Sequence, residues 1–442
     1  MPIIDSVVSD TDLPQKSSVA IIGGGIVGVS TALELAERGI DVVLLEKGEI
    51  GAEQSGRNWG WCRQMGRDPR EIPLVLESLR LWGGMNERIG AETGFVQSGI
   101  VYLCETDAQL AAREKWYAEN AKPFGLGSRM ISGQEAASLM PGSARKWKGA
   151  LYTSADGRAE PFKATAAMAR AARRKRAKIF TNCAARGLET SAGRVSAVVT
   201  EKGTIACDTV VLAGGAWSRR FCHNAGIALP QLGVISSVKR TDPIDAGFTR
   251  TGSGGKFSIR KRIDGGFTIA HRHLAVADIV PDSFRLFFRF LPALMLDWGG
   301  LRLRLGQRFM DEAGLARRWQ LDEVSPFERV RILDPEPVTA ILDEASASLK
   351  EYFPAFQNMR IAERWAGVID AMPDAVPVMS PVEKLKGFYL ATGFSGHGFG
   401  LGPGAGKLMA QMVTGERPCV DPSPFCYARY FDGTNPRPTT GL

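Results

Sequence analysis

The chain has 442 residues, of which 44% are hydrophobic and 23% are charged. This composition is ordinary for a globular protein, and the length is enough for two domains with large buried cores. The formal net charge of +8 is modest over this length, so charge alone does not decide between anionic substrates, a membrane surface and nucleic acid.

The cysteines and the first residues bear on the cellular compartment. Seven cysteines lie at irregular spacing without a C-x-x-C pair, which argues against a disulfide framework and a zinc site and favours a reducing cytoplasm. Residues 1–17 lack the basic and apolar regions of a signal peptide, and no apolar run is long enough to span a bilayer. We therefore expect residues 1–17 to be a loose tail and the protein to be cytoplasmic.

The clearest local pattern lies in residues 19–46, which read VAIIGGGIVGVSTALELAERGIDVVLLE. The apolar run at 19–22 is typical of a strand buried on both faces, and helical spacing of apolar residues follows the glycines. A second apolar strand at 42–45 ends on Glu46. The turn between the first strand and the helix fits G-x-G-x-x-G and comprises Gly23, Gly24, Gly25, Ile26, Val27 and Gly28.

Each position of this unit has a physical role in dinucleotide binding. Gly23 permits the tight turn, Gly25 lets the backbone approach a pyrophosphate, and Gly28 lets the helix pack closely on the strand. The N-terminus of the helix offers free N–H groups and a positive dipole to the phosphates. Glu46 is placed to accept hydrogen bonds from a ribose diol. Because strand, turn, helix and acid follow in this order, the sequence predicts a dinucleotide site rather than an ordinary βαβ unit.

The loop after Glu46 and a later basic helix each allow two interpretations. Ser55 and Arg57 could lie over the phosphates or rings of the cofactor, or the loop at 53–60 could be a solvated turn. Residues 161–178 predict a helix with a basic run at 170–178. Since no aromatic residues are interleaved there, a solvated helix face is favoured over a nucleic-acid patch.

Three later segments carry further candidates. Residues 208–217 predict a buried strand that runs into glycines, where a cofactor would lie beyond the carboxyl end of the strand. Arg272 ends a predicted strand and could be an inward-facing cation or a surface residue. Residues 283–308 alternate Phe and Leu with arginines, which fits either a membrane interface or a helical hairpin packed on the domain.

The last motif, at 389–403, is a strand followed by a glycine-rich loop and a helix N-terminus. The positive end of that helix could stabilise negative charge on a reduced flavin. The four histidines show no H-x-x-x-H spacing, and the chain has neither a G-x-S-x-G elbow nor a Walker A lysine. We therefore expect no metal, and the dinucleotide cofactor is the expected source of chemistry.

The two glycine-rich segments resemble those of the D-amino-acid-oxidase superfamily of flavoproteins. The similarity is greater to the bacterial L-amino-acid deaminases, and it rests on EQSGR (53–57), LWGGMNERIGAETGF (81–95), KIFTNCAARGLET (178–190), VVLAGGAWSR (210–219), LDEVSPFERVRI (321–332) and DPSPF (421–425). The resemblance implies an α/β (α+β) fold, in which a Rossmann-like FAD-binding domain accompanies a discontinuous substrate domain on a mixed or antiparallel sheet. It also implies non-covalent FAD.

The resemblance assigns domains and cofactor contacts. The FAD-binding domain would comprise 18–90, 150–230 and 366–442, and the substrate domain 91–149 and 231–365, with an inserted module at 283–308. Beyond the glycine turn and Glu46, the implied cofactor contacts are Lys47, Gln54, Ser55, Arg57, Asn58, Ala185, Ala213, Gly214, Gly215, Trp217, Gly393, Gly396, Gly398, Phe399, Gly400 and Leu401.

The implied activity is oxidation of an amino acid, with L-amino acids favoured, at its Cα–N bond by hydride transfer to flavin N5. The imine product would hydrolyse to a 2-oxo acid and ammonia. Arg272 matches an arginine that pairs with the substrate carboxylate, and His397 lies near the flavin. D-amino acids or secondary amines are the alternative substrates, and an RNA-associated flavoprotein is a weaker hypothesis. The electron acceptor would be oxygen or a quinone. Residues 283–308 could also place the protein at the periphery of the inner membrane.

Overall fold

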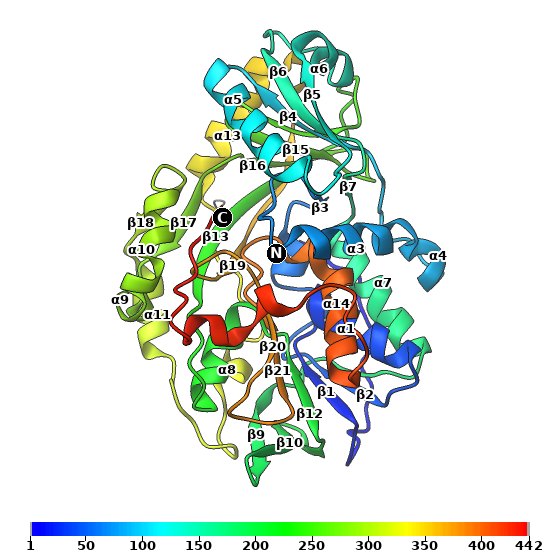
Figure 1. The fold of residues 1–442 in the computed structure, drawn as a ribbon, viewed down its shortest axis with the longest axis vertical. Helices are drawn as coiled ribbons and strands as arrows, with labels where there is room; N and C mark the ends of the chain where they lie inside the picture. The colour runs from blue at the N-terminus through cyan, green and yellow to red at the C-terminus, as the bar shows by residue number, and fades with distance from the viewer. Residues whose placement is uncertain (1, 440–442) are drawn as a thin grey trace.

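The computed structural model describes residues 2–439, which form two domains around two large sheets (Figure 1). The lower domain in Figure 1 contains a six-stranded sheet in the order β20-β21-β12-β1-β2-β8. Its strands are β1 (Val19–Ile22), β2 (Val42–Leu45), β8 (Lys178–Phe180), β12 (Thr209–Leu212), β20 (Val378–Pro381) and β21 (Phe388–Thr392). All are parallel except β20, and the central strands are apolar runs because helices cover both faces.

Helices pack closely around this sheet. The principal ones are α1 (Ile26–Glu37), α3 (Ile72–Gly83), α7 (Pro161–Arg174) and α14 (Gly398–Thr414). Small residues allow the close approach of α1 and α14, since a Cβ added to Gly406 would lie 2.4 Å from the Cβ of Ser30. Helix α14 comes from the end of the chain, so the two glycine-rich segments of the sequence lie side by side. The predicted α/β class with a Rossmann-like domain is confirmed.

The upper domain is built on a ten-stranded mixed sheet in the order β18-β17-β13-β16-β15-β14-β4-β6-β5, with β19 paired to β13. Its strands are β4 (Ile100–Cys104), β5 (Ser128–Ser132), β6 (Gly149–Thr153), β13 (Leu232–Thr241), β14 (Thr251–Gly254), β15 (Phe257–Lys261), β16 (Phe267–His271), β17 (Ala275–Asp278), β18 (Leu301–Arg304) and β19 (Ile361–Ala371). Most neighbours are antiparallel; β14 with β4 and β17 with β18 are parallel.

The two faces of the large sheet differ in their partners. On β4, Val101 and Leu103 pack into an aromatic core beneath α13 (Thr339–Tyr352), whereas Tyr102 packs with Trp61 and Met65. This alternation is that of a strand, in which successive side chains point to opposite faces. The face of the large sheet that carries Tyr102 therefore packs against the segment around Trp61 and Met65, which connects the lower domain to the upper one.

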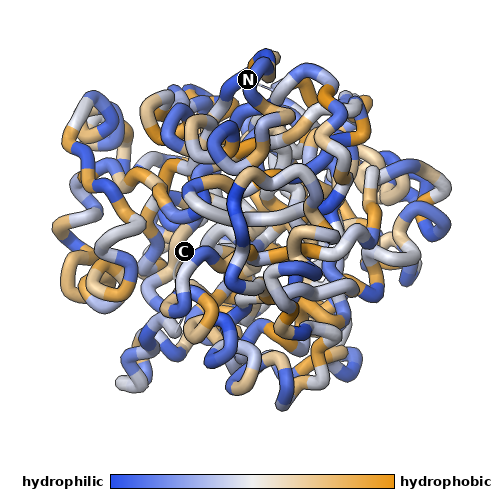
Figure 2. The backbone as a smooth tube through the Cα atoms, turned by 90° about the horizontal axis from the view of Figure 1, so that it is seen from above, coloured by the Kyte–Doolittle hydropathy of each residue, from blue (hydrophilic) through white to orange (hydrophobic). Residues whose placement is uncertain are grey.

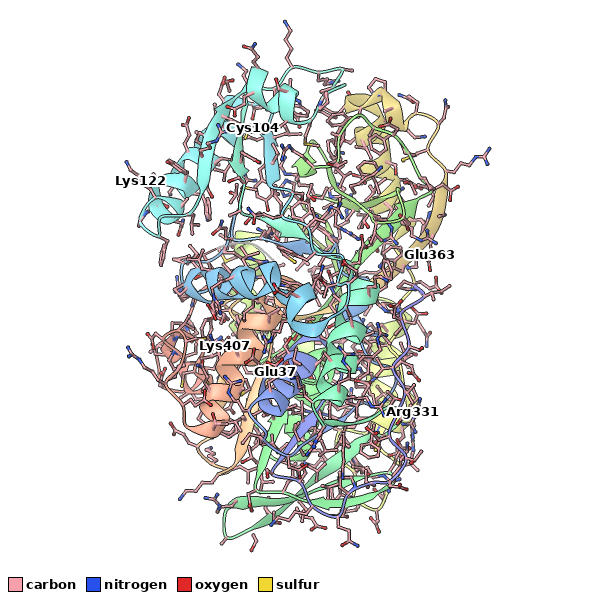
Figure 3. The ribbon with its side chains drawn as sticks, turned by 90° about the vertical axis from the view of Figure 1, so that its right-hand side faces the viewer. Glu37, Cys104, Lys122, Arg331, Glu363 and Lys407 are labelled. Carbon is pink, nitrogen blue, oxygen red and sulfur yellow. The ribbon has the colours of Figure 1, made fainter. Side chains whose placement is uncertain are left out.

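The remaining elements connect or extend the two domains. They are α2 (Gln54–Arg57), β3 (Trp61–Cys62), α4 (Met85–Ile89), α5 (Asp107–Trp116), η1 (Tyr117–Ala121), α6 (Gly133–Leu139), β7 (Gly157–Arg158), β9 (Ala185–Ser191), β10 (Arg194–Thr200), β11 (Gly203–Ala206), η2 (Gly215–Trp217), α8 (Ser218–Asn224), α9 (Pro281–Arg285), α10 (Phe287–Leu296), α11 (Gln307–Gly314), α12 (Pro326–Arg329), η3 (Pro354–Phe356), η4 (Ser423–Phe425) and η5 (Tyr427–Tyr430). In the side view of Figure 3, Cys104 and Lys122 mark the upper domain, and Glu37 and Lys407 mark the lower one.

Two predicted domain limits need correction. Strand β6 begins at Gly149 and pairs with β4 and β5 of the large sheet, so residues 150–153 lie in the upper domain. Strand β19 runs continuously across the predicted limit at 365/366. Sequence patterns identify a strand but not the sheet that it joins, which is why both limits were misplaced.

The prediction of a loose tail is wrong for residues 2–17. Val7 is buried, and the Asp10 carboxylate accepts hydrogen bonds from Arg173 and from the backbone N–H of Ile179. Arg170 of the basic run likewise donates to the carbonyl of Ser6. The basic face of α7 thus holds the N-terminal segment; Met1 lies outside the described residues.

The segment 283–308 forms α9, α10, β18 and the start of α11 at the left edge of Figure 1. Figure 2 shows apolar stretches through the interior and also on peripheral windings of the chain. Large apolar side chains are exposed in this segment, with Phe288 at 85% and Trp298 at 70%. Within residues 2–439, no helix combines the length and apolar character needed to cross a membrane.

Candidate active site

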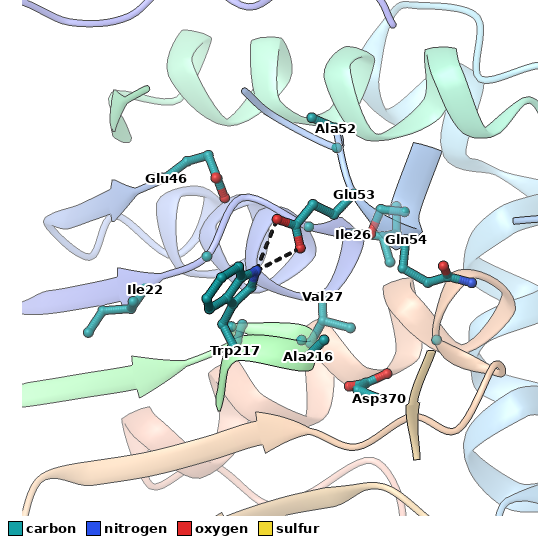
Figure 4. Close-up of a pocket in the computed structure, with 18 of the residues that line it drawn as sticks. Ile22, Ile26, Val27, Glu46, Ala52, Glu53, Gln54, Ala216, Trp217 and Asp370 are labelled. Atoms are coloured by element: carbon teal, nitrogen blue, oxygen red, sulfur yellow. Dashed lines mark hydrogen bonds between the residues drawn. The ribbon is translucent and has the colours of Figure 1, made fainter. Parts of the chain in front are cut away.

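A cleft with an empty volume of about 1200 Å³ opens at the carboxyl ends of β1, β2 and β12 (Figure 4). Its walls are the glycine turn, the first residues of α1, the loop 46–58, residues 212–217 and the segment 391–399 that leads into α14. This is where ligands bind in open α/β sheets. The two glycine-rich motifs, more than 360 residues apart, thus line one cavity.

The glycine turn leaves no room for side chains. A Cβ on Gly23 would lie 2.3 Å from the carbonyl oxygen of Ala213, and one on Gly28 would lie 2.0 Å from the carbonyl oxygen of Gly23. Gly23 also has φ of +112°, which L-residues rarely adopt. The turn is therefore held against the next strand, and the free N–H groups of α1 face the cleft.

Glu46 lies on one wall of the cleft and fixes the glycine turn. Its two carboxylate oxygens accept hydrogen bonds from the backbone N–H groups of Gly24 and Gly48, each at 2.7 Å. Burial raises the pKa of Glu46 above its ordinary value. The carboxylate faces the cleft with acceptor capacity left, as a ribose-binding acid requires.

The loop at 53–58 supplies polar side chains to the same wall. Ser55 Oγ accepts a hydrogen bond of 2.9 Å from the N–H of Ile26, the first residue of α1. The side chain of Asn58 is held by the carbonyl oxygens of Gln54 and Ser55. Gln54 Oε1 is buried without a partner among the described residues, so a donor group is missing from this wall.

Glu53 and Trp217 lie between Glu46 and Asp370 in Figure 4, and hydrogen bonds join them to each other and to Lys47. Trp217 Nε1 donates to both oxygens of Glu53, at 3.0 and 3.1 Å, and Lys47 Nζ donates to Glu53 at 2.6 Å. The Lys47 ammonium also lies 4.5 Å from the centroid of the Trp217 ring. Glu53 was missed as a site residue, although it precedes Gln54 and Ser55 in the sequence.

Asp370 at the end of β19 was also missed. Its Oδ2 accepts hydrogen bonds from the N–H groups of Gly393 and Phe394, at 2.7 and 3.3 Å, and from the hydroxyl of Thr392. Burial raises the pKa of Asp370 to about 6. The carboxylate lines the cleft and holds the glycine loop in place. Only the tertiary structure brings it there, since nothing in residues 361–377 alone indicates a partner.

Most of the predicted cofactor residues line the cleft. They are Gly23, Gly25, Ile26, Val27, Glu46, Lys47, Gln54, Ser55, Asn58, Ala185, Ala213, Gly214, Gly215, Trp217, Gly396, Gly398 and Phe399. The others are not among its lining residues: Gly24, Gly28, Arg57, Gly393, Gly400 and Leu401. Arg57 is buried and donates to Asp334 and to the carbonyl oxygens of Ala52 and Ala366. Its guanidinium therefore joins segments of the protein instead of reaching the cleft.

His397 is the N-cap residue of α14, between the lining residues Gly396 and Gly398. Its Nδ1 lies 3.0 Å from Oε2 of Glu71, the N-cap residue of α3. Burial lowers the pKa of His397, and the charge of Arg67 lowers it further. The contact with Glu71 fixes the orientation of the ring.

Arg272 follows β16 and is half-buried on the same face of the large sheet as Tyr102. Its Nη1 has one long contact, 3.5 Å, with the carbonyl oxygen of Leu103. Burial, with Arg113 close by, lowers the pKa of Arg272 to about 10. It does not line the cofactor cleft, and its guanidinium makes no ion pair with a carboxylate among residues 2–439.

Thiols and metal ligands contribute little to this region. Cys62 is buried beside it, and burial raises its pKa above that of an ordinary thiol. In the part of the chain that the structure describes, no group of three or more His, Cys, Asp and Glu side chains is arranged to hold a metal ion.

Comparison with known proteins agrees with this geometry. The model of the DAO family, described as FAD dependent oxidoreductase, matches residues 18–412. The chain belongs to this family. The solved structure of an L-amino acid deaminase from Proteus myxofaciens, in complex with anthranilate, is 36% identical with a TM-score of 0.92, covering 97% of this chain and 96% of that one. L-amino acid deaminase from Proteus vulgaris is 32% identical with a TM-score of 0.91 over 96% of this chain and 99% of that one.

Among curated proteins, the glycine oxidase of Pseudomonas aeruginosa is 26% identical over 93% of this chain and 98% of its own length. This FAD-dependent oxidoreductase is therefore similar over nearly its full length to enzymes that oxidise amino acids. The predicted family and the predicted FAD dependence are confirmed.

The residues of the cleft fit FAD. The turn at Gly25 and the N-terminus of α1 would hold the pyrophosphate, Glu46 would accept hydrogen bonds from the ribose diol, and the unpartnered Gln54 Oε1 could accept one from the ring system. When bound there, FAD supplies a two-electron acceptor that no side chain of the chain can replace.

Proposed function

We propose that this enzyme oxidises an amino acid at its Cα–N bond, with L-amino acids favoured, to an imine that hydrolyses to a 2-oxo acid and ammonia. The observation that carries the proposal is Arg272, a half-buried guanidinium without a carboxylate partner on the sheet face next to the cofactor domain. An arginine can bind a substrate carboxylate through two parallel hydrogen bonds, which fixes orientation as well as position. The similarity to L-amino acid deaminases supports the same chemistry.

The roles of the other residues follow from their environments. His397 is held in place by Glu71, and burial lowers its pKa, so its role is to position groups next to the cleft. A hydride leaves Cα only when the amine is neutral, and no protein base is required for that transfer. The positive end of α14 faces the cleft and favours negative charge there.

The test is anaerobic mixing of the purified yellow protein with L-, D- and N-methyl amino acids while flavin absorbance is followed. Rapid bleaching by L-amino acids alone supports the proposal. Bleaching only by D-amino acids, or only by N-methyl amino acids with release of formaldehyde, would show that the enzyme acts on a different class of substrate within the same protein family. If none of them bleaches the flavin, the proposal fails. Readmitting air then separates an oxidase from an enzyme that needs a quinone.

We also propose that FAD is bound without a covalent link. Cys62, the cysteine nearest in sequence to the cofactor loop, is buried and is not among the residues that line the cleft. Denaturation in acid should therefore release all of the flavin into the supernatant. Yellow colour that remains with the precipitated protein would contradict this expectation.

A peripheral membrane contact through residues 283–308 is a separate part of the proposal. Phe284, Phe288, Met295 and Trp298 are exposed at 68–85% on one segment that also carries arginines. Apolar side chains below and arginines at the headgroups are the pattern of an interfacial helix. The protein should float with anionic liposomes, and Phe288→Ser combined with Trp298→Ser should abolish flotation. Equal flotation of both proteins would overturn this contact.

A further inference from the structure

Four arginines surround Tyr102 on the face of the large sheet that looks toward the lower domain. The guanidinium carbons of Arg63 and Arg113 lie 5.9 and 4.8 Å from the centroid of the Tyr102 ring. Arg67 and Arg272 are both close enough to the Tyr102 hydroxyl and to a second arginine for the charges to interact. We call Arg63, Arg67, Arg113 and Arg272 the Tyr102 cluster.

The Tyr102 cluster is a concentration of positive charge without paired negative charge. Among residues 2–439, none of its four guanidinium groups makes an ion pair with a carboxylate. Arg67 is 2% exposed, donates through Nε to the carbonyl of Arg63, and has no partner at Nη1. Burial and the charge of Arg63 lower the pKa of Arg67 to about 9. A buried guanidinium in this state costs free energy unless an anion joins it.

The acids near the Tyr102 cluster are engaged elsewhere. Glu71 holds His397, and Glu105 accepts from the hydroxyl of Tyr352 and the N–H of Gly255. Asp156 accepts the backbone N–H groups of Gln64 and Met65, and burial raises its pKa to about 7. The charges of Asp156 and Glu71 act on Arg67, but neither carboxylate forms an ion pair with an arginine of the cluster among residues 2–439.

The cluster adjoins the reaction site. Arg67 and Arg63 are near enough to His397 to lower its pKa, and His397 is flanked by two residues that line the cofactor cleft. The N-terminus of α14 packs on the same segment, since a Cβ on Gly400 would lie 3.1 Å from the carbonyl oxygen of Trp61. The arginines therefore extend from the substrate sheet, at Arg272, to the cofactor side, at Arg67.

We propose that the substrate is an amino dicarboxylic acid, whose α-carboxylate binds Arg272 and whose second carboxylate binds Arg67 and Arg63. This inference rests on the proposed function, which already assigns the α-carboxylate to Arg272. One carboxylate can satisfy one guanidinium bidentately, and Arg67 Nη1 would remain unpaired. A second carboxylate at the far end of the substrate satisfies it, whereas the side-chain amide of a neutral amino acid leaves the buried charge uncompensated.

The experiment compares matched pairs of substrates on the FAD-loaded enzyme. Rates of anaerobic flavin reduction are measured with glutamate against glutamine and aspartate against asparagine, using both enantiomers of each. We expect kcat/KM for the better acid to exceed that of its amide by roughly 30-fold or more. Calorimetric binding of glutarate against butyrate provides a readout without turnover, and glutarate should bind at least about 10-fold more tightly.

Two variants locate the effect. Arg67→Met should remove most of the preference for the acid over its amide, and Arg63→Met, at a half-buried position, should reduce it if the first variant does not fold. Arg417→Met changes an exposed arginine outside the cluster and should leave the preference unchanged. A preference that survives in both cluster variants would overturn the assignment of Arg67 and Arg63.

The outcomes separate this inference from the proposed function. If neutral amino acids reduce the flavin as fast as the dicarboxylic acids do, the proposed function stands and the inference is wrong. If no amino acid reduces the flavin but glutarate still binds more tightly than butyrate, the anion site stands and the proposed function fails. Equal binding of glutarate and butyrate, together with equal rates, would refute the site.

Discussion

The arginines inside this molecule have two opposite kinds of surroundings: some are paired with a carboxylate and some are not. At the junction of the two domains, Arg260 donates to Glu160 at 2.7 Å and to the carbonyl oxygen of Trp59, with both side chains of the ion pair 1% exposed or less. Arg429 donates to both oxygens of Asp374, at 3.1 and 3.2 Å. In the Tyr102 cluster, Arg67 and Arg272 have no such carboxylate among the described residues.

The difference separates structural charge from charge that a ligand must complete. A buried guanidinium with its carboxylate joins segments distant in sequence, and removing one partner leaves the other uncompensated. A buried guanidinium without a carboxylate lowers the stability of the free protein and gains a partner only when an anion binds. Substitutions in the two regions should therefore affect different quantities: stability in the first and catalysis in the second.

The largest expected effect is on stability, from Glu160→Gln at the domain junction. The change leaves Arg260 buried without its counter-charge, beside Arg158 and Arg262, and should lower the free energy of unfolding by roughly 3–5 kcal/mol. Urea unfolding of the FAD-loaded protein measures it. Glu135→Gln, which breaks the exposed pair with Arg129, should change stability by less than about 0.5 kcal/mol. Similar losses in the two variants would show that burial does not decide the cost.

The next effect is on catalysis, from Arg272→Met. Loss of the guanidinium that pairs with the substrate carboxylate should weaken transition-state binding by about 2–5 kcal/mol. This corresponds to a fall in kcat/KM of roughly 30-fold to several thousand-fold. Because the free protein loses an unpaired charge, its free energy of unfolding should stay the same or rise. Flavin reduction kinetics and urea unfolding on the same preparation test both statements. Unchanged kcat/KM would remove Arg272 from the substrate site.

The contrast also explains which features the sequence could predict. The glycine turn and Glu46 were predicted because strand, turn, helix and acid are local in sequence, and the structure places them in one cleft. Arg57 lies in the loop that follows Glu46 and was predicted to bind the cofactor. The structure instead pairs it with Asp334, 277 residues later. Which arginines are paired is decided by contacts of this range, so local patterns do not report it.

Other residues of the site also depend on tertiary contacts that local sequence patterns do not show. Glu53 and Asp370 acquire their roles from Trp217, 164 residues away, and from the glycine loop at 393–394, which begins 23 residues away. The Tyr102 cluster draws on α5, the loop after β3 and the end of β16, which the sheet topology brings together. The predicted domain limit at residue 150 differs from the structure because the sequence of β6 indicates a strand but not which sheet the strand joins.

A smaller effect should appear in the pH dependence of stability, at Asp156. Burial raises the pKa of Asp156 to about 7, so the native protein binds more protons than the unfolded chain between about pH 4 and pH 7. The stability that Asp156 contributes is therefore present at low pH and is lost as the pH rises toward 7. In Asp156→Asn this loss disappears, and the variant should gain on the order of 1–3 kcal/mol relative to the wild type between pH 5 and pH 8.

The measurement is the free energy of unfolding of both proteins at the two pH values, and only the difference in slope is diagnostic. Asparagine cannot accept from both Gln64 and Met65 in the way the carboxylate does, which lowers stability by an amount independent of pH. Parallel pH profiles for the two proteins would show that Asp156 is ionised throughout this range.

The smallest effect is expected at the edge of the Tyr102 cluster, from Arg113→Met. Arg113 is half-buried on α5, 4.8 Å from the Tyr102 ring, where water and salt screen its charge better than that of Arg67. Its loss should cost about 0.5–1 kcal/mol, seen as a two- to five-fold rise in KM for an anionic substrate with little change in kcat. Raising the ionic strength to 0.5 M should reduce the difference between variant and wild type, whereas the effect of Arg67→Met should persist. If both variants respond equally to salt, the buried Arg67 and the half-buried Arg113 do not differ as their surroundings indicate.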